Sequence, residues 1–170
     1  TSGGLWRYKI GDTIEFTSTN PYLFRITGRT RQYINAFGEE LIVDNADRAM
    51  AEACRITRAK VTEYTAAPIY FDDQHGGAHE WLIEFEESPA DMDQFKMVLD
   101  EQLKKLNSDY EAKRSYNLSL GMPVIRVLEQ GCFYKWMKYR EKVGGQNKVP
   151  KLSNDRKYVD SILEALDLKS

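Results

Sequence analysis

The sequence has 170 residues, of which 42% are hydrophobic and 12% aromatic, and its 24 Lys and Arg against 26 Asp and Glu give a formal net charge of −2. This composition predicts one ordinary core and excludes a disordered chain, while the near-balanced charge argues against a surface built throughout for nucleic acid or anionic lipid. Cys54 and Cys132 are too few for a disulfide framework, and no apolar run is long enough for a membrane span, so we expect a cytoplasmic protein with free thiols and no membrane partner.

The first part of the sequence favours short β-strands. Aromatic and β-branched residues are concentrated in residues 5–10, 13–18 and 22–27, which are separated by Gly-Asp and Asn-Pro turns, so we expect a small antiparallel meander. A second, shorter hairpin is expected to turn at Gly38. The meander gives way to a different pattern near residues 28–31, where we place the one organisational boundary of the chain.

Helical and extended patterns alternate in the rest of the chain. From Asp44, which we expect to cap a helix, apolar residues recur at helical spacing. Residues 61–70 and 80–86 predict neighbouring strands, joined by the polar turn FDDQHGGAH. Ser88 and the proline after it predict the start of a second helix, whose apolar stripe ends at Leu106.

An irregular connection is expected after that helix, before a third strand at residues 122–129. Residues 131–143 predict a third helix, and residues 155–168 predict a fourth. The run of glycines and a proline between these helices predicts a loop. The element order therefore predicts an α+β fold, in which short β-hairpins are followed by a small, mainly antiparallel sheet packed against helices.

The histidines and glycines do not match a known metal or phosphate site. His75 and His79 have a spacing that suits a metal ion when a helix places both on one face, and the two glycines between them exclude that helix. We therefore interpret both histidines as part of a hairpin turn. Neither a P-loop nor a G-x-G-x-x-G motif occurs, and neither cysteine has an activating neighbour in sequence.

Positive charge is concentrated toward the end of the chain. Between Arg126 and Lys157, nine basic residues stand against three acidic ones, so this segment carries +6 and the rest of the chain −8. A solvated helix face is the simplest interpretation of Lys135, Lys138 and Lys142. The functional alternative is a positive surface that faces phosphates, either of a nucleotide or of a nucleic acid.

Three residues have the chemistry of a nucleotide site. Asp12 lies in a Gly-Asp turn, where aspartate ordinarily caps the turn, but a fixed carboxylate can also accept two hydrogen bonds from a ribose diol. Arg29, one hairpin later, offers a planar donor fork for the same sugar or for a phosphate. Lys148 lies in the loop GGQNKVPKLSND, and a solvated charge with no task is the ordinary interpretation of a lysine there.

The segments GLWRYKIGD, FRITGRTRQYINAFGEEL and QGCFYKWMKYREKVGGQNKVPK resemble, in order and spacing, the C-terminal part of the auxin-responsive acyl-acid amido synthetase family. This family belongs to the acyl-adenylate-forming superfamily. The resemblance runs over nearly the whole chain, is strongest at its two ends, and is weak between about residues 44 and 110. It implies a two-part enzyme, with a large N-terminal domain that this sequence does not contain and a small C-terminal lid domain.

The resemblance implies that residues 1–30 are the end of the N-terminal adenylation domain and the approach to a hinge, and that residues 31–170 are the lid domain. The whole enzyme would use ATP and Mg²⁺, bound mainly by the N-terminal domain, to adenylate a carboxylic acid. It would then transfer the acyl group to an amine, usually an amino acid, to form an amide and AMP. The chain by itself would be inactive.

Particular positions match the residues that carry roles in the family. Asp12 matches the aspartate that holds the ribose hydroxyls, and Arg29 matches an arginine near the same sugar. Lys148 matches the lid lysine that reaches the α-phosphate and the reacting carboxylate. Arg31 lies at the hinge position, where the wider superfamily commonly has aspartate or lysine, and Lys151 stands where plant members tend to have an arginine.

The alternative is a non-enzymatic α+β module that binds RNA or a small anionic effector through the basic segment. The aromatic-rich strand of sheet-platform RNA-binding proteins is not present in the sequence, which makes nucleic acid the less favoured partner. The sequence therefore favours the ligase, and it leaves the acyl acid and the amine open.

Overall fold

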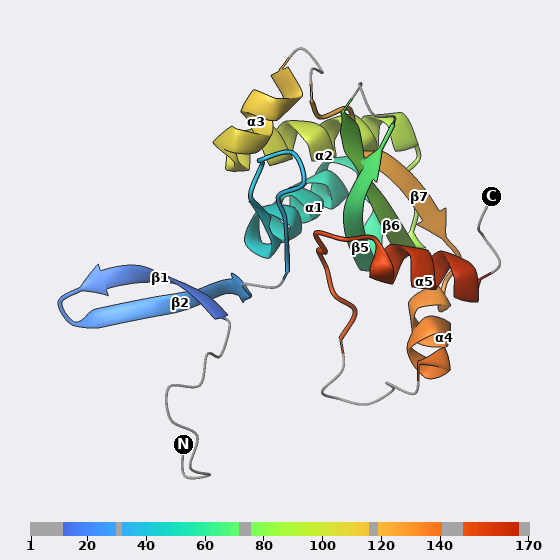
Figure 1. Ribbon diagram of the computed structural model, residues 1–170, viewed down its shortest axis with the longest axis horizontal. Coiled ribbons are helices and arrows are strands. Elements are labelled where there is room, and N and C mark those ends of the chain that lie inside the picture. The colour runs from blue at the N-terminus through green and yellow to red at the C-terminus, as the bar shows by residue number, and fades with distance from the viewer. Residues whose placement is uncertain (1–11, 30–31, 72–75, 116–118, 141–147, 167–170) are drawn as a thin grey trace, which may run out of the picture.

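The computed structural model describes residues 12–29, 32–71, 76–115, 119–140 and 148–166. In chain order the elements are β1 (Asp12–Thr19), β2 (Tyr22–Arg29), β3 (Tyr33–Ile34), β4 (Leu41–Ile42), α1 (Val43–Thr57), β5 (Lys60–Tyr70), β6 (Gly77–Glu87), α2 (Met92–Leu106), α3 (Ser108–Arg114), β7 (Val124–Leu128), α4 (Cys132–Tyr139) and α5 (Lys157–Ala165). A hairpin of β1 and β2 projects from a body of helices packed on a small sheet (Figure 1). The predicted α+β class is confirmed.

The central sheet has three strands in the order β5-β6-β7. β5 runs antiparallel to β6, whereas β7 runs parallel to β6 because α2 and α3 form the crossover between them. β5 is therefore an edge strand. On its outer side, Ala66 forms an isolated parallel bridge with Leu152. The sheet is mixed, and its largest pairing is antiparallel as predicted.

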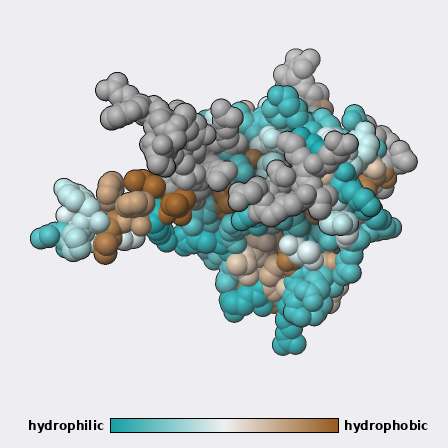
Figure 2. Space-filling model, turned by 90° about the horizontal axis from the view of Figure 1, so that it is seen from below, coloured by the Kyte–Doolittle hydropathy of each residue, from teal (hydrophilic) through white to brown (hydrophobic). Residues whose placement is uncertain are grey.

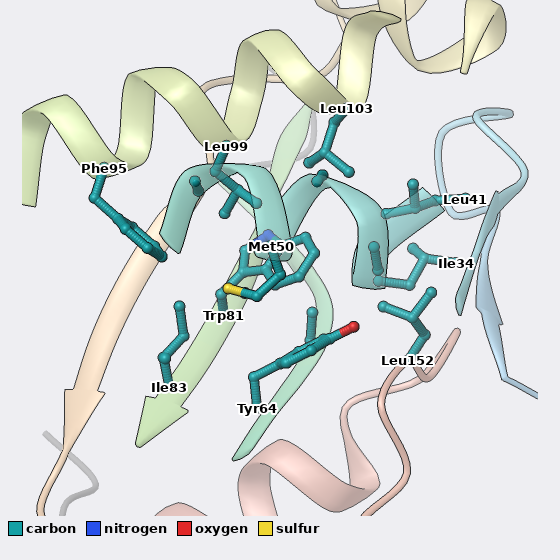
Figure 3. Close-up of a cluster of buried hydrophobic side chains, with 14 of the residues drawn as sticks. Ile34, Leu41, Met50, Tyr64, Trp81, Ile83, Phe95, Leu99, Leu103 and Leu152 are labelled. Atoms are coloured by element: carbon teal, nitrogen blue, oxygen red, sulfur yellow. The ribbon is translucent and has the colours of Figure 1, made fainter. Parts of the chain in front are cut away.

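The two faces of the sheet bury two separate hydrophobic clusters. The first cluster packs α1 and α2 against one face of β5 and β6, and it includes the fully buried Trp81 and Leu99 (Figure 3). The second cluster packs α4 and α5 against the other face around Leu82 and Trp136. Neighbouring residues of a strand alternate between the faces, so Ala66 belongs to the first cluster and Ala67 to the second.

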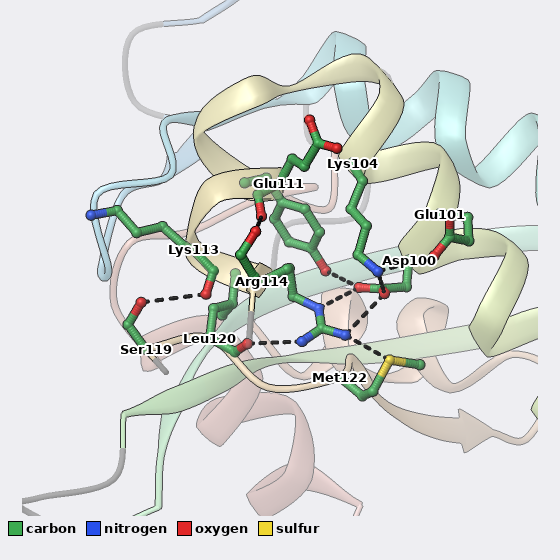
Figure 4. Close-up of polar contacts among 11 residues, drawn as sticks. Asp100, Glu101, Lys104, Glu111, Lys113, Arg114, Ser119, Leu120 and Met122 are labelled. Atoms are coloured by element: carbon green, nitrogen blue, oxygen red, sulfur yellow. Dashed lines mark hydrogen bonds and ion pairs between the residues drawn. The ribbon is translucent and has the colours of Figure 1, made fainter. Parts of the chain in front are cut away.

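A buried ion pair joins α2 to α3. Arg114 donates from Nε and Nη2 to the two carboxylate oxygens of Asp100, at 2.6 and 3.0 Å, and the Tyr110 hydroxyl donates to the same carboxylate at 2.8 Å (Figure 4). The Lys104 amine lies 2.8 Å from it. Burial alone would raise the pKa of the Asp100 carboxyl, but the bonds from Arg114, Lys104 and Tyr110 outweigh burial and hold that pKa below its ordinary value.

Helix α3 occupies part of the connection that we expected to be irregular. Asn107 ends α2 and also caps α3, since its side-chain oxygen accepts a hydrogen bond from the Tyr110 backbone N–H at 2.8 Å. The prediction was wrong because a helix of seven residues offers too little apolar periodicity, and one of its two buried side chains is the charged Arg114.

Two predicted helix starts were also wrong. The N-cap of α2 is Asp91 rather than Ser88, and its side chain accepts from the backbone N–H groups of residues 93 and 94 at 2.9 and 3.0 Å. Asp44 lies inside the first turn of α1, whose N-cap is Ile42. The Asn45 side-chain oxygen accepts a hydrogen bond from the Ile42 backbone N–H at 3.3 Å. The backbone N–H at the start of this helix is therefore satisfied by the side chain of a residue three positions later.

The interpretation of His79 as a turn residue was wrong. His79 lies inside β6 with 1% of its surface exposed, and its Nε2 is 2.7 Å from the Glu39 carboxylate. Burial opposes ionisation of Glu39, but the hydrogen bond and the charge of His79, together with backbone hydrogen bonds from residues 37 and 39, outweigh burial and lower the pKa of Glu39. Within the described ranges, no group of three His, Cys, Asp or Glu side chains is arranged to hold a metal ion.

Gly38 has a φ of 86° between β3 and β4, as a turn residue in a hairpin requires. The predicted strand at residues 5–10 and His75 lie outside the described residues. The last helix is shorter than residues 155–168, since α5 covers Lys157–Ala165. Every helix in the described part of the chain is too short or too polar to cross a bilayer.

We expect Asp100→Asn to lower the free energy of unfolding by about 3 kcal/mol at neutral pH, because the buried guanidinium of Arg114 would lose the charge of its bidentate partner. The stabilisation from ionised Asp100 is fully present above its ordinary pKa of 3.8 and is lost as pH falls through the lowered folded-state pKa. The difference between variant and parent should therefore shrink in acid, and urea unfolding at neutral and acid pH measures it.

Glu101→Gln is the matched control on the same helix. Glu101 also pairs with Lys104, at 3.0 Å, but its side chain is 60% exposed. We expect this variant to change stability by no more than about 0.5 kcal/mol at any pH. Equal losses in the two variants would contradict a special role for the buried pair.

Candidate functional site

Lys148 is exposed and is the first residue of the stretch 148–156, which we name the lysine segment. The next residue, Val149, has only 7% of its surface exposed and belongs to the second hydrophobic cluster. The amine of Lys148 is therefore presented to solvent one residue from a buried side chain.

Backbone hydrogen bonds fix the lysine segment to the free edge of β5. The Ala66 N–H donates to the Lys151 carbonyl at 2.9 Å, and the Ser153 N–H donates to the Ala66 carbonyl at 3.0 Å. The Thr65 hydroxyl adds a third bond, to the Pro150 carbonyl at 2.6 Å. These bonds satisfy edge groups that an exposed edge strand would leave open.

The lysine segment crosses from one face of the sheet to the other. Val149 packs in the second cluster, with residues of α4 and α5. Leu152 is fully buried in the first cluster, where it lies near Ile34 of β3 (Figure 3). The segment therefore contributes to both cores, although it has no helix or long strand of its own.

The lysine segment also contacts the residues that follow the predicted hinge. The Asn35 backbone N–H donates to the Asn154 side-chain oxygen at 2.8 Å, across 119 positions of sequence. Together with the packing of Leu152 near Ile34, this bond places the start of the body next to the lysine segment.

Arg156 attaches the end of the segment to the sheet. Its guanidinium donates to the Glu80 carboxylate at 2.7 Å and to the Pro68 carbonyl at 3.1 Å. Glu80 is 4% exposed and also accepts from Arg126 at 3.2 Å, so one buried carboxylate receives two guanidinium groups. This is the charge-paired geometry that makes a buried carboxylate tolerable.

Lys151 points toward α1 and β5. Its amine is 3.0 Å from the Asp47 carboxylate, 3.8 Å from that of Glu63, and 4.3 Å from the centre of the Tyr64 ring. Burial raises the pKa of Glu63, and the charge of Lys151 opposes that rise. Burial, and next the hydrogen bond to Asp47, raise the pKa of Tyr64 far above its ordinary value, so this phenol stays protonated. Lys151 therefore acts here as a clamp between elements of the fold.

Much of the positive charge near the end of the chain is compensated locally. Among the described residues, Arg126, Lys151, Arg156 and Lys157 each lie within salt-bridge distance of a carboxylate. Arg140 lies over the Trp136 ring, with 4.9 Å from its guanidinium carbon to the ring centre. Within the described part of the basic segment, these five cations are thus paired or stacked, whereas Lys148 is exposed.

The backbones of Asp12 and Arg29 lie directly opposite each other. The two residues are register partners at the base of the β1-β2 hairpin. The sequence motifs therefore place an acid and a base of the predicted ribose site at one end of one ribbon. Arg31 lies outside the described residues. The side chains of Asp12 and Arg29 also lie outside the described part of the structure.

Sequence reasoning missed three residues that hold the lysine segment, namely Asn35, Thr65 and Asn154. Thr65 is a small polar residue in the middle of a strand, where only its full burial reveals that its hydroxyl must have a partner. The two asparagines flank turns, and their pairing depends on a contact between distant parts of the chain. No local signal could have identified these contacts.

A sequence model described as the GH3 family C-terminal domain matches residues 44–157, more than half of the chain. The chain belongs to the GH3 family. The match includes Lys148 and the region from 44 to 110, where we had found the resemblance weak. The predicted resemblance to the acyl-acid amido synthetases is confirmed at the level of the family.

Solved structures of GH3 proteins have the same fold. A structure described as GH3.15 acyl acid amido synthetase superposes with a TM-score of 0.77 at 21% identity, covering 97% of this chain and 31% of that protein. A second, AtGH3.15 acyl acid amido synthetase in complex with 2,4-DB, gives a TM-score of 0.69 at 18% identity, covering 95% and 31%. The chain thus spans about a third of the length of these proteins. No curated protein matches the chain in sequence.

We expect Lys151→Met to lower the free energy of unfolding by about 1 kcal/mol at neutral pH, since it removes a partly exposed cation from two carboxylates and one ring. The part of this attraction that comes from Glu63 is lost as pH falls through the raised pKa of that group, so the effect of the substitution should diminish in acid. Urea unfolding as a function of pH measures this.

Lys157→Met provides the control within the same part of the chain. Lys157 also pairs with a carboxylate, that of Asp155 at 3.0 Å, but its side chain is 82% exposed. We expect no more than about 0.5 kcal/mol from this change. A Lys151 variant as stable as the parent at neutral pH would refute the clamp.

Proposed function

We propose that this chain is the lid of an ATP-dependent ligase that adenylates a carboxylic acid and transfers the acyl group to an amine, most simply an amino acid. The observation that carries the proposal is the GH3 family match across Lys148, in a structure that presents this lysine on an anchored segment. The activity belongs to the whole protein, and we expect the chain alone to be inactive.

In the first half-reaction, a carboxylate oxygen attacks the α-phosphorus of ATP, the bond to the β-phosphate breaks, and pyrophosphate leaves. Negative charge is distributed over the phosphoryl oxygens in the transition state. Lys148 supplies a cation at these oxygens and at the attacking carboxylate, and a charge positioned in advance where negative charge accumulates lowers the barrier. We assign Lys148 this role.

In the second half-reaction, the amine attacks the carbonyl carbon of the acyl-adenylate, AMP leaves, and the amine loses a proton. We assign Asp12 to the ribose hydroxyls and Arg29 to the same sugar, with Arg31 at the hinge. Mg²⁺ and most of the ATP contacts belong, in this proposal, to the larger part of the protein, where the triphosphate would be held.

An exposed apolar face on the hairpin supports a division of the chain near residue 30. Register pairs place Ile14 opposite Ile26 and Phe16 opposite Phe24, and these side chains are 48% to 65% exposed. Figure 2 shows the hydrophobic residues gathered on the projecting hairpin. An isolated two-stranded ribbon is marginally stable in water. We therefore propose that residues 1–30 pack on a preceding adenylation domain, while residues 31–170 form the lid.

The acyl acid is proposed only by class. One structural relative is described in complex with 2,4-DB. We propose a carboxylic acid as the substrate that is adenylated, and 2,4-DB is a reasonable first probe of the full-length protein.

We expect Lys148→Ala in the full-length protein to lower acid-dependent ATP-pyrophosphate exchange by about 10²-fold or more, because a cation that stabilises the transition state is removed. Amide formation from a supplied acyl-adenylate should change by less than about threefold, since that step breaks no bond to pyrophosphate. A panel of carboxylic acids that includes 2,4-DB serves both assays.

Lys157→Ala is the control for Lys148→Ala, because it removes an exposed lysine nine positions further along and should leave both half-reactions unchanged. Equal loss of both half-reactions in Lys148→Ala would refute the assigned role. The absence of exchange with every acid in the panel would count against the ligase itself.

The hairpin offers a separate test of the domain division. If Phe24 is covered by a preceding domain, Phe24→Ser should lower the free energy of unfolding of the full-length protein by about 2 kcal/mol or more. Glu15→Gln alters an ion pair to Arg25 on the other face of the ribbon, and we expect no more than about 0.5 kcal/mol from it. If Phe24→Ser also lowers the free energy of unfolding by no more than about 0.5 kcal/mol, the apolar face stays exposed in the full-length protein.

A further inference from the structure

The position of Lys148 depends on how the two residues after it are held. Val149 is buried, and the Pro150 carbonyl accepts a 2.6 Å hydrogen bond from the hydroxyl of Thr65. Proline fixes its own φ, so Pro150 is a stiff point between this bond and Lys148. The Thr65 hydroxyl thus makes the side-chain hydrogen bond nearest in sequence to Lys148 among those recorded for the described residues of the segment.

Thr65 is buried completely and lies in the middle of β5, opposite Leu82 of β6. Its position on the strand matches the face of the second cluster, which contains Ala67 and Val149. Valine would fill the same volume in this apolar environment and would favour the strand equally well. The hydroxyl is therefore the distinguishing property of threonine here, and the Pro150 carbonyl is the group that it contacts.

We propose that Thr65 is a positioning residue for Lys148. Its hydroxyl fixes the carbonyl two residues beyond the lysine, and so sets the place from which the lysine amine approaches the phosphate. The inference rests on the role proposed for Lys148, since Thr65 touches no substrate and acts through the segment alone. The backbone ladder from Ala66 to Lys151 and Ser153 holds the segment downstream, while Thr65 holds the end that carries the amine.

The test uses the full-length protein with Thr65→Val, which removes the hydroxyl and keeps the shape, and Thr65→Ser, which keeps the hydroxyl. Thr65→Val should lower the kcat of ATP-pyrophosphate exchange roughly tenfold. This value lies between the rate loss expected for one lost hydrogen bond and the rate loss expected when a catalytic group is displaced by about 1 Å. The KM for ATP and the rate of amide formation from supplied acyl-adenylate should change less than about twofold. Thr65→Ser should restore most of the exchange rate.

Thr57→Val is the matched control for loss of a threonine hydroxyl. Thr57 donates to the Ala53 carbonyl at 2.7 Å near the end of α1. It makes a bond of the same kind away from the lysine segment, and its removal should leave the ratio of the two half-reactions unchanged. A general loss of stability would affect this control and Thr65→Val alike.

A double variant separates positioning from a structural role. If Thr65 acts through Lys148, adding Thr65→Val to Lys148→Ala should cause no further loss of exchange, because no amine remains to be positioned. Losses that multiply would overturn the proposal.

The failures of the two proposals can be told apart. Normal exchange in Lys148→Ala would refute the role of the lysine itself, and the inference about Thr65 with it. Impaired exchange in Lys148→Ala together with normal exchange in Thr65→Val would leave the proposed function intact and refute only the positioning role.

Discussion

The closure of the free edge of β5 is the constraint on which the rest of the structure depends. β5 is the outer strand of a three-stranded sheet, and its exposed backbone groups would otherwise be open to water or to another chain. The lysine segment satisfies Ala66 through both its N–H and its carbonyl. Val149 and Leu152 then enter opposite cores. A stretch that looks like a loop in sequence therefore joins the two cores of the fold.

Because the edge of β5 is closed by the lysine segment, Lys148 can be exposed and still be held in a defined place. A lysine on a free loop would lose conformational entropy each time that it met its target. Here the chain beyond Lys148 is part of both cores, so the lysine moves with the whole body. Under the proposed function, the rotation of the domain delivers the amine, and only the side chain of Lys148 adjusts locally.

Hydrophobic periodicity predicted α1, α2, β5 and β6 well, because their buried residues repeat along one element. The polar interior was less predictable. Glu84 is buried because it accepts hydrogen bonds from the Gly131 and Phe133 N–H groups at 2.7 and 3.2 Å, at the start of α4. His79 is buried because Glu39 meets it across 40 positions. Each of these residues looks exposed in sequence, since the partner that compensates its burial comes from a distant segment.

The contacts of the candidate site were equally hard to predict, because they join segments that are far apart in sequence. Sequence could name Lys148 by resemblance, yet nothing local indicated that Asn35 would bond to Asn154 or that Leu152 would pack near Ile34. These contacts connect the residues just after the predicted hinge with the lysine segment. Because packed interiors transmit displacement rather than absorb it, a rotation at the proposed hinge would carry Ile34, Leu152 and hence Lys148 together under the proposed function. Under the proposed function, the orientation of the lid then sets the reach of the lysine, and a change at the proposed hinge is sufficient to control it.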